Sequence, residues 1–269
     1  MRVLRSIASL TGVVNLKSVL VAALAVLSTW VSLQLGITAD FPLTLVATAI
    51  VFPLVFSIST AYARREKALE DYGKIKAHGR ALYFASRDWL PNPDEERDTE
   101  LKGALYELLS ASRDMFTNPL SEMARFEARI YAAFRRLSLF VREMRAQDLS
   151  PTECARLNQY VSHMMTAFEN IKHIYEYRTP RTLRAFSEFF ILLLSVLYGP
   201  YFAYQAVEFR QDFFWVMPAL FALILVGLAN IQDNLENPFD QIGQDDVAID
   251  PDYFLKTLAN GIVSETAAR

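Results

Sequence analysis

The side chains that most often carry catalysis or bind metals are few in this chain. It has three histidines and one cysteine, namely His78, His163, His173 and Cys154. No histidine stands at a metal-ligand spacing from the cysteine, and no nucleophile motif surrounds any of the four. The sequence also lacks a phosphate-binding loop, a G-x-S-x-G motif and a pair of carboxylates within an apolar segment. We therefore expect a protein that is not an enzyme and needs no nucleotide, with these four as ordinary helix residues.

The composition is typical of a membrane protein. Of the 269 residues, 52% are hydrophobic and 21% are charged, and the mean hydropathy is positive. That mixture indicates membrane spans together with a water-facing part. The net charge of −3 argues against nucleic acid as a partner, because neutralising phosphates requires a basic face. The single cysteine excludes an internal disulfide, so nothing marks a secreted protein.

Four windows without charged residues are long enough to cross a bilayer. Each has about the 20 residues that a ~30 Å hydrocarbon layer requires. Apolar and charged residues recur at helical rather than alternating spacing, which predicts an all-α protein. The first two windows are joined by a very short link, so they read as a hairpin anchor rather than a cleaved signal peptide. The windows are residues 18–36, 41–63, 189–207 and 213–232.

Basic residues flank these windows on one side. They precede the first and third windows and follow the second. In the links 37–40 and 208–212, by contrast, most of the charged residues are acidic. The positive-inside rule therefore places both termini in the cytoplasm, for a protein of the plasma membrane or a bacterial inner membrane. The predicted order is a cytoplasmic N-terminal segment (1–17), transmembrane helices 1 and 2 (18–63), a cytoplasmic helical domain (64–188), transmembrane helices 3 and 4 (189–232) and an acidic cytoplasmic C-terminal segment (233–269).

The central block reads as a helical bundle joined to the membrane by one long helix. The second span continues in helix-forming composition as far as Pro91, and a helix from Pro42 to Trp89 would be roughly 70 Å long at 1.5 Å per residue. That is about twice the hydrocarbon thickness. Three helix starts are also predicted, because a capping side chain directly precedes a proline. These are Asn92-Pro93, Asn118-Pro119 and Ser150-Pro151, the last with a capping-box glutamate at Glu153.

Three stretches, taken in this order, resemble the bestrophin family of ion channels. The first is "FSISTAYARREKALEDY" (56–72), where an aromatic residue, Tyr62 and Arg64 fall at the family's spacing. The second is "YEYRTPRTLRAFSEFF" (175–190), which is similar to the segment leading into the third span. The third is "LENPFD" (235–240), followed by the acidic "QIGQDDVAID". The resemblance implies a homopentamer around a central pore, lined in the membrane by the second span.

The resemblance also implies where the pore is narrow. In the family, residues at i, i+4 and i+8 of the second span form a neck, and they match Thr48, Phe52 and Phe56 here. That spacing places all three on one helix face, so five copies would form stacked rings. Apolar rings can gate by dewetting, and the positive edges of aromatic rings can tolerate a passing anion. The alternative is that Phe52 and Phe56 pack against lipid or a neighbouring span.

A second, cytoplasmic constriction is implied at Arg181. Family members commonly carry an apolar side chain at this position, directly after the residue that matches Pro180. Five guanidinium groups there would attract anions and oppose cations. The alternatives are pairing with Glu176 or Glu188, or contact with lipid headgroups. Helix stability does not explain the arginine, because a cation in the first turn costs about 0.3–1 kcal/mol against the helix dipole.

The acidic turn after the last span has two interpretations. Some animal bestrophins form a Ca²⁺ clasp there, and by resemblance the nearest matches are Asn234, Asn237, Asp245 and Asp246. Their hard oxygen atoms suit Ca²⁺. The favoured alternative is architectural: the helix ends at Asn237-Pro238, and the segment folds against the base of the next subunit.

Together these patterns predict a pentameric channel that passes small anions, chloride in particular, down their gradient. Its expected partners are its own copies, small inorganic ions and membrane lipid. Fold does not by itself determine selectivity, so a cation-permeable channel of the same fold is an alternative. A non-conducting membrane scaffold whose helical block binds a partner is a third hypothesis.

Overall fold

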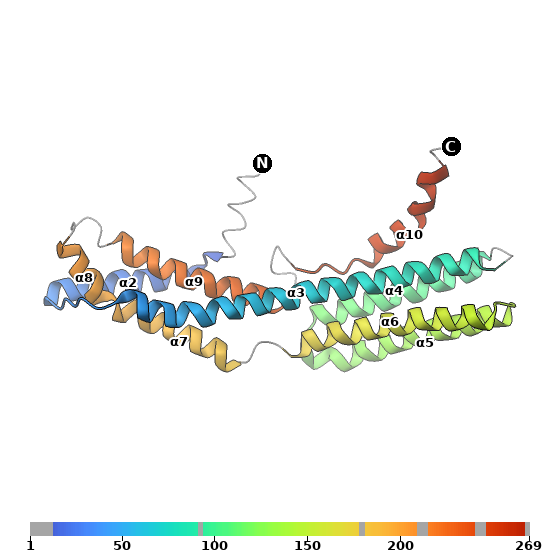
Figure 1. The fold of residues 1–269 in the computed structure, drawn as a ribbon, viewed down its shortest axis with the longest axis horizontal. Helices are drawn as coiled ribbons and strands as arrows, with labels where there is room; N and C mark the ends of the chain where they lie inside the picture. The colour runs from blue at the N-terminus through green and yellow to red at the C-terminus, as the bar shows by residue number, and fades with distance from the viewer. Residues whose placement is uncertain (1–12, 91–93, 178–180, 209–214, 240–245, 267–269) are drawn as a thin grey trace. The chain divides into compact units, whose positions relative to one another are not determined.

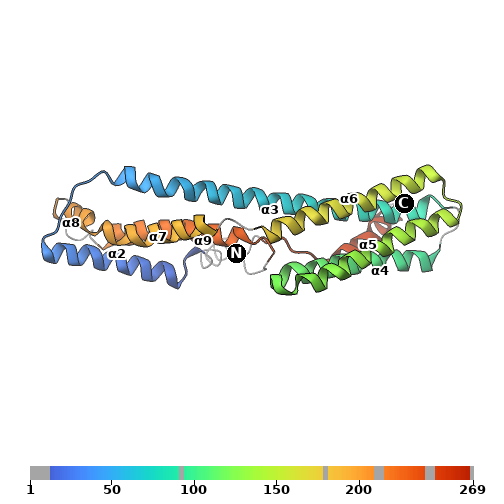
Figure 2. The same ribbon diagram turned by 90° about the horizontal axis from the view of Figure 1, so that it is seen from below.

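The computed structural model describes residues 13–90, 94–177, 181–208, 215–239 and 246–266. Over these ranges the chain is built from α-helices and one 3-10 turn, and it contains no strand, which confirms the all-α prediction. The chain divides into two compact units (Figures 1 and 2). Unit 1 holds the described residues up to Arg65 and from Arg181 to Asn237. Unit 2 holds those from Glu66 to Tyr177 and from Pro238 onward.

Unit 1 is a bundle of apolar helices. It comprises α2 (Leu16–Leu35), the first part of α3 (Leu43–Asp88), α7 (Arg181–Leu197), α8 (Gly199–Glu208) and α9 (Val216–Glu236). The described chain has four helical segments long and apolar enough to cross a membrane, in agreement with the four windows. They are Leu16–Leu35, Ala47–Asp88, Ala185–Glu208 and Val216–Glu236. The second of them belongs to a single 46-residue helix, as the composition predicts.

The core of unit 1 forms where α2 packs against α7, α8 and α9. Small side chains from α2 and α9, among them Ala22, Ala25 and Ala222, are buried there and let the helix backbones approach closely. Ile50 and Leu54 add one face of α3 to the same core. The orientation of α3 within unit 1 is therefore set by its buried face.

Asn15, Ser18 and Asn230 form a group of hydrogen-bonded polar side chains in this apolar unit. Asn15 caps α2, and its side chain accepts a hydrogen bond from the Ser18 amide at 3.0 Å. Asn230, buried in α9, donates from its amide nitrogen to the Val13 carbonyl at 2.6 Å and to Ser18 Oγ at 3.1 Å. An unpaired amide in hydrocarbon costs several kcal/mol, so these bonds hold the start of α2 against α9.

The third predicted window, residues 189–207, is two helices rather than one. The helix α7 ends at Leu197, and α8 begins at Gly199, directly before Pro200. Pro200 has no N–H to donate to the carbonyl four residues earlier, that of Val196. The hydroxyl of Ser28 on α2 donates to this carbonyl instead, at 2.7 Å. The break is therefore stabilised by the neighbouring helix, an effect that a hydropathy window does not detect.

The close contact between Gly199 and Ser28 predicts that Gly199→Ala lowers the stability of the protein. A Cβ at this position would collide with Ser28 Oγ and would lie 2.8 Å from the Ser28 carbonyl carbon. Because one of these atoms is backbone, α2 and α8 must separate, at a cost of about 1–3 kcal/mol. Thermal unfolding in detergent should show a clearly lower midpoint. Gly73→Ala is the control, because nothing lies within 4 Å of its added Cβ; equal midpoints for the two variants would contradict the packing argument.

Unit 2 is a bundle of amphipathic helices around an apolar core. It comprises the second part of α3 with α4 (Glu95–Thr117), the 3-10 turn η1 (Leu120–Glu122), α5 (Met123–Ala146), α6 (Pro151–Glu176) and α10 (Pro251–Thr266). The side chains of Leu82, Leu105, Phe134 and Phe168 are among those fully buried in its core. Cys154 is also buried there, in agreement with its interpretation as a helix residue.

Only one of the three predicted helix starts is correct in detail. Ser150 and Glu153 form a reciprocal capping box at the start of α6. The cap of α4 is Asp94, which accepts from two backbone amides, and not Asn92, which lies outside the described residues. Asn118 ends α4 instead of starting a helix, since its amide nitrogen donates to the Asp114 carbonyl at 2.7 Å. Asn-Pro pairs suit either end of a helix, so spacing alone does not distinguish them.

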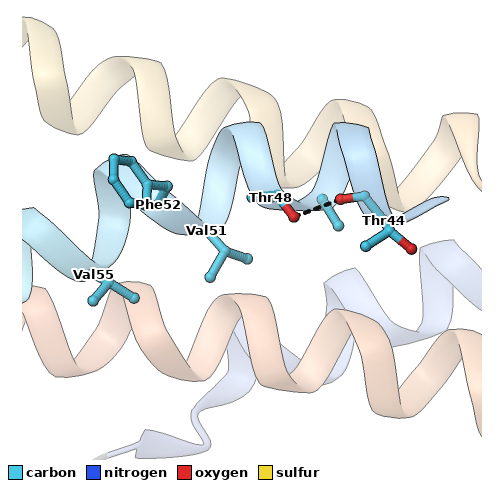
Figure 3. Close-up of a pocket in the computed structure, with 6 residues that line it drawn as sticks. Thr44, Thr48, Val51, Phe52 and Val55 are labelled. Atoms are coloured by element: carbon cyan, nitrogen blue, oxygen red, sulfur yellow. Dashed lines mark hydrogen bonds between the residues drawn. The ribbon is translucent and has the colours of Figure 1, made fainter. Parts of the chain in front are cut away.

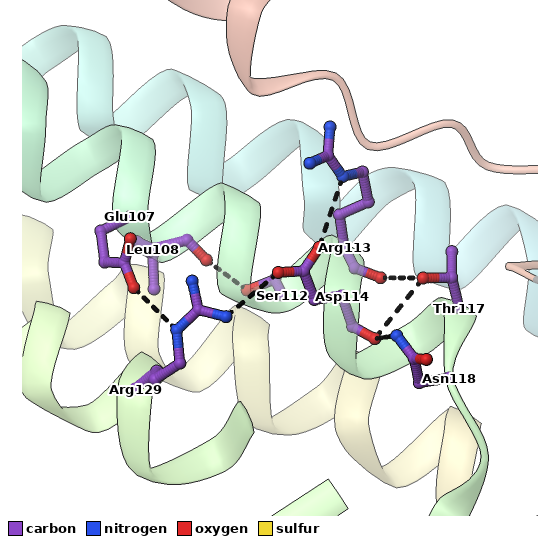
Figure 4. A network of polar contacts seen from close by, with 8 residues as sticks. All are labelled: Glu107, Leu108, Ser112, Arg113, Asp114, Thr117, Asn118 and Arg129. Carbon is purple, nitrogen blue, oxygen red and sulfur yellow. Dashed lines mark hydrogen bonds and ion pairs between the residues drawn. The ribbon is translucent and has the colours of Figure 1, made fainter. Parts of the chain in front are cut away.

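A polar network joins α4 to α5 in unit 2 (Figure 4). Arg129 Nε donates to Glu107 at 2.9 Å, and Arg129 Nη1 donates to Asp114 at 3.1 Å. All three side chains are partly exposed to solvent, so each pair contributes on the order of 1 kcal/mol or less. The network orients the two helices, whereas the apolar core supplies most of the stability.

The Asn-Pro-Phe motif ends α9 and contributes an aromatic side chain to unit 2. The helix ends with Asn237 as its C-cap, as the sequence predicts. The Phe239 ring is 1% exposed and stacks on Phe116 at 4.8 Å between ring centroids. The Pro238 carbonyl accepts a hydrogen bond from the Val247 amide at 2.7 Å. The described part of the acidic segment is thus attached to the bundle by Phe239 and Val247.

Candidate functional site

The membrane-type part of α3 has one buried face and one exposed face. Ile50, Leu54 and Ala61 are buried in the chain. At 100° per residue these positions lie within a narrow arc, and the predicted neck residues lie on the opposite side. Phe52 is 61% exposed and Phe56 is 57% exposed, although both belong to an apolar helix. The chain thus leaves two large aromatic side chains uncovered at the centre of this face.

Thr48 and Phe52, two of the three predicted neck residues, lie beside Thr44, Val51 and Val55 on α3 (Figure 3). The Phe52 and Phe56 rings meet edge to face, with centroids 4.6 Å apart and an interplanar angle of 74°. Thr48 and Phe52 also border a shallow groove of about 300 Å³. Three other residues labelled in Figure 3 line the groove and were missed by the sequence analysis, although their i+3 and i+4 spacing is a usable signal. They are Thr44, Val51 and Val55.

The hydroxyl of Thr48 is already engaged within its own helix. It donates to the Thr44 carbonyl at 2.6 Å, and Thr60 donates in the same way to the Phe56 carbonyl at 2.9 Å. A hydroxyl that donates its proton to the backbone presents only lone pairs to its surroundings. In addition, Pro53 has no N–H for the Ala49 carbonyl, which therefore lacks its usual helical donor. This part of α3 presents oxygen atoms beside its aromatic rings.

Arg181 is the first residue of α7 as the structure describes it. Its side chain, like residues 178–180, lies outside what the structure describes, and the cytoplasmic ring stays a prediction. Glu188, one of the acids considered as its partner, forms an ion pair with Lys17 at 3.1 Å.

The calcium-clasp residues are only partly described. Asn234 is exposed in the last turn of α9, and Asn237 Oδ1 is buried with no hydrogen-bond partner among the described residues. Asp246 is half-buried, whereas Asp245 lies outside the described residues. Among described side chains, no group of three or more His, Cys, Asp or Glu is placed to hold a metal ion. Calcium binding stays a prediction.

The fold defines a class: an all-α protein with four helical segments long and apolar enough to cross a membrane and a second, amphipathic bundle. Within that class the chain has a bestrophin-like fold. A variant of a bacterial bestrophin homologue from Klebsiella pneumoniae is similar over 93% of this chain and 99% of its own, with a TM-score of 0.74 and 18% identity. Another structure of the Klebsiella pneumoniae homologue covers 94% of this chain and 97% of its own, with a TM-score of 0.70 and 18% identity.

No protein-family model and no curated protein sequence matches the chain. At 18% identity the similarity to solved structures is one of fold. It agrees with the resemblance noted in the sequence, which rested on the order of three short stretches. The function of the exposed face has to be argued from its own side chains.

Proposed function

We propose that this protein is a bestrophin-like anion channel, assembled as a homopentamer around a pore that the exposed face of α3 lines. Chloride is the favoured ion. Thr48, Phe52 and Phe56 form the neck, Arg181 forms a cytoplasmic ring, and conduction is passive. The protein lies in the plasma membrane or a bacterial inner membrane with both termini in the cytoplasm, surrounded by lipid.

The observation that carries this proposal is a difference between two exposed helix faces. Between Val19 and Val31, every exposed side chain of α2 is apolar, as expected for a surface in contact with lipid. The exposed face of α3 between Thr44 and Ala63 instead mixes aromatic rings with hydroxyl groups. Lipid tails offer such hydroxyls no hydrogen-bond partner, whereas the water in a pore does. The exposed hydroxyl-bearing residues on this face are Thr44, Thr48, Ser59, Thr60 and Tyr62.

A cation channel is the second candidate, and a specific observation favours it. The Thr48 hydroxyl proton is committed to the Thr44 carbonyl, so a ring of these residues would offer lone pairs rather than donors. The Ala49 carbonyl beside Pro53 adds to this character. Oxygen lone pairs stabilise a partly dehydrated cation. The edges of Phe52 and Phe56, by contrast, tolerate an anion. Selectivity therefore depends on which of these groups dominates at the narrowest point.

Two measurements on purified protein test the proposal. Native mass spectrometry should give the mass of five chains, because the proposed pore is enclosed by the α3 helices of five copies. In a tenfold NaCl gradient across a planar bilayer, the current through the protein should reverse near the chloride equilibrium potential. Reversal near the sodium equilibrium potential would select the cation channel. A stable monomer, or no flux of either ion from wild type and from a neck-widened variant, would leave the membrane scaffold as the remaining hypothesis.

A further inference from the structure

We propose that His78 and His163 form a transition-metal site in unit 2, which takes a borderline divalent cation such as Zn²⁺. The two residues are separated by 85 positions in the sequence, so no spacing rule detects them. The structure places His78 on α3 and His163 on α6 with their ring centroids 5.0 Å apart. This inference is independent of ion conduction.

The ring separation fits two imidazoles bound to one metal ion. With Zn–N bonds of about 2.0–2.1 Å and tetrahedral angles, two histidine ligands hold their ring centroids about 5 Å apart. The two ring planes differ by 69°, which is compatible with coordination because each ring can rotate about its metal–nitrogen bond. His163 is exposed and His78 is half-buried, so water can complete the coordination from the solvent side. A site with two protein ligands and open positions is therefore expected.

Packing directly beside the pair makes it rigid. Gly79, which follows His78, lies close to three core side chains: its missing Cβ would stand 3.2 Å from Leu105, 3.4 Å from Phe254 and 3.8 Å from Met164. Met164 follows His163 in α6. The absence of a side chain at Gly79 thus leaves room for Leu105 of α4, while Met164 of α6 lies at ordinary van der Waals distance beside the two histidines. In addition, Tyr160 stacks on the His78 ring at 5.6 Å and limits its rotation.

The surroundings of His78 favour a neutral imidazole, the form that binds a metal ion. Burial lowers the pKa of the His78 imidazole, and His163 and Lys74 lower it further, so the ring is neutral at neutral pH and retains its lone pair. Lys74 is the cation that acts on the His78 imidazole. Its ammonium group is held by Glu70 at 2.6 Å and by Asp71 at 2.8 Å, which offsets its repulsion of a metal ion.

The test uses full-length protein in detergent, without a histidine tag, and Zn²⁺ alone as the probe. Equilibrium dialysis should show one Zn²⁺ bound per chain. His78→Gln and His163→Gln should each weaken binding about tenfold or more, because each removes one of two nitrogen ligands. His163→Cys should retain binding, since a thiolate is also a zinc ligand. Co²⁺ bound at the site should show visible absorption bands that the two glutamine variants lose.

His173→Gln is the matched control. His173 is the remaining histidine of the chain, and its ring contacts Tyr177 at 4.5 Å instead of another histidine. Its loss should leave Zn²⁺ affinity unchanged. Unchanged helical circular dichroism in all variants keeps the comparison valid. Equal Zn²⁺ affinity in wild type and His78→Gln, or equal weakening by His173→Gln, would overturn the site.

Discussion

Replacing both Phe52 and Phe56 with alanine is expected to raise ion flux about tenfold or more, because lowering a barrier by 1.4 kcal/mol is enough for that change. Five copies of each ring would narrow and dry the proposed pore, and truncation would widen and wet it. Both side chains are uncovered in the chain, so their removal leaves the core of unit 1 intact. Flux from liposomes and single-channel current in planar bilayers measure the effect.

Phe189→Ala is the matched control for this double variant. Phe189 is 60% exposed, close to the value of Phe52, but it belongs to α7 rather than α3. If the exposed face of α3 lines the pore, this variant should conduct like wild type. A similar rise in flux for Phe189→Ala would indicate general loosening of the protein. No rise in the double variant would mean that the two rings face lipid or another helix, the alternative considered from the sequence.

Arg181→Glu is expected to move ion selectivity from chloride toward sodium. In a pentamer the change converts five positive charges at one level of the pore into five negative ones, and close rings of charge act strongly on passing ions. A fully selective pore holds a reversal potential of about 59 mV for each tenfold gradient of a monovalent ion. In a tenfold NaCl gradient the reversal potential should therefore shift by tens of millivolts toward the value for sodium.

The control for this variant is Arg135→Glu, which makes the same charge change at an exposed position of α5. Surface charges of this kind are screened within about 10 Å at 0.1 M salt, so its reversal potential should match that of wild type. A shift of equal size in both variants would indicate a general surface-charge effect. An unchanged potential in Arg181→Glu would remove this residue from the selectivity mechanism.

Helix existence and type were predictable because they depend on local sequence. Charge-free windows marked each membrane-type helix, and the unbroken helix-forming composition after the second window predicted the continuous α3. The capping box at Ser150 was also predictable, since its two partners are three residues apart. The sequence predictions were wrong where residues outside the local pattern determine how a helix begins or ends. The end of α7 depends on Ser28 from α2, and the role of Asn118 depends on which helix end is nearby.

The neck residues were predicted through a family resemblance, and the structure adds details of these residues that the resemblance does not contain. It shows that Thr48, Phe52 and Phe56 share an exposed face of α3. It also shows that Thr48 uses its proton within the helix, a detail that matters for selectivity. The role of Arg181 depends on side-chain placement that the described residues do not include, so only its position at the start of α7 is known.

Periodicity and composition are local properties, and they were sufficient to define an all-α chain with four apolar segments and a charged bundle. Contacts between distant parts of the chain are not local. The histidine pair joins positions 78 and 163, and the attachment of the C-terminal segment joins Phe116 to Phe239. Such pairs become neighbours only when whole helices pack, because the free energy of burying their apolar faces, and not any sequence spacing, decides which side chains meet.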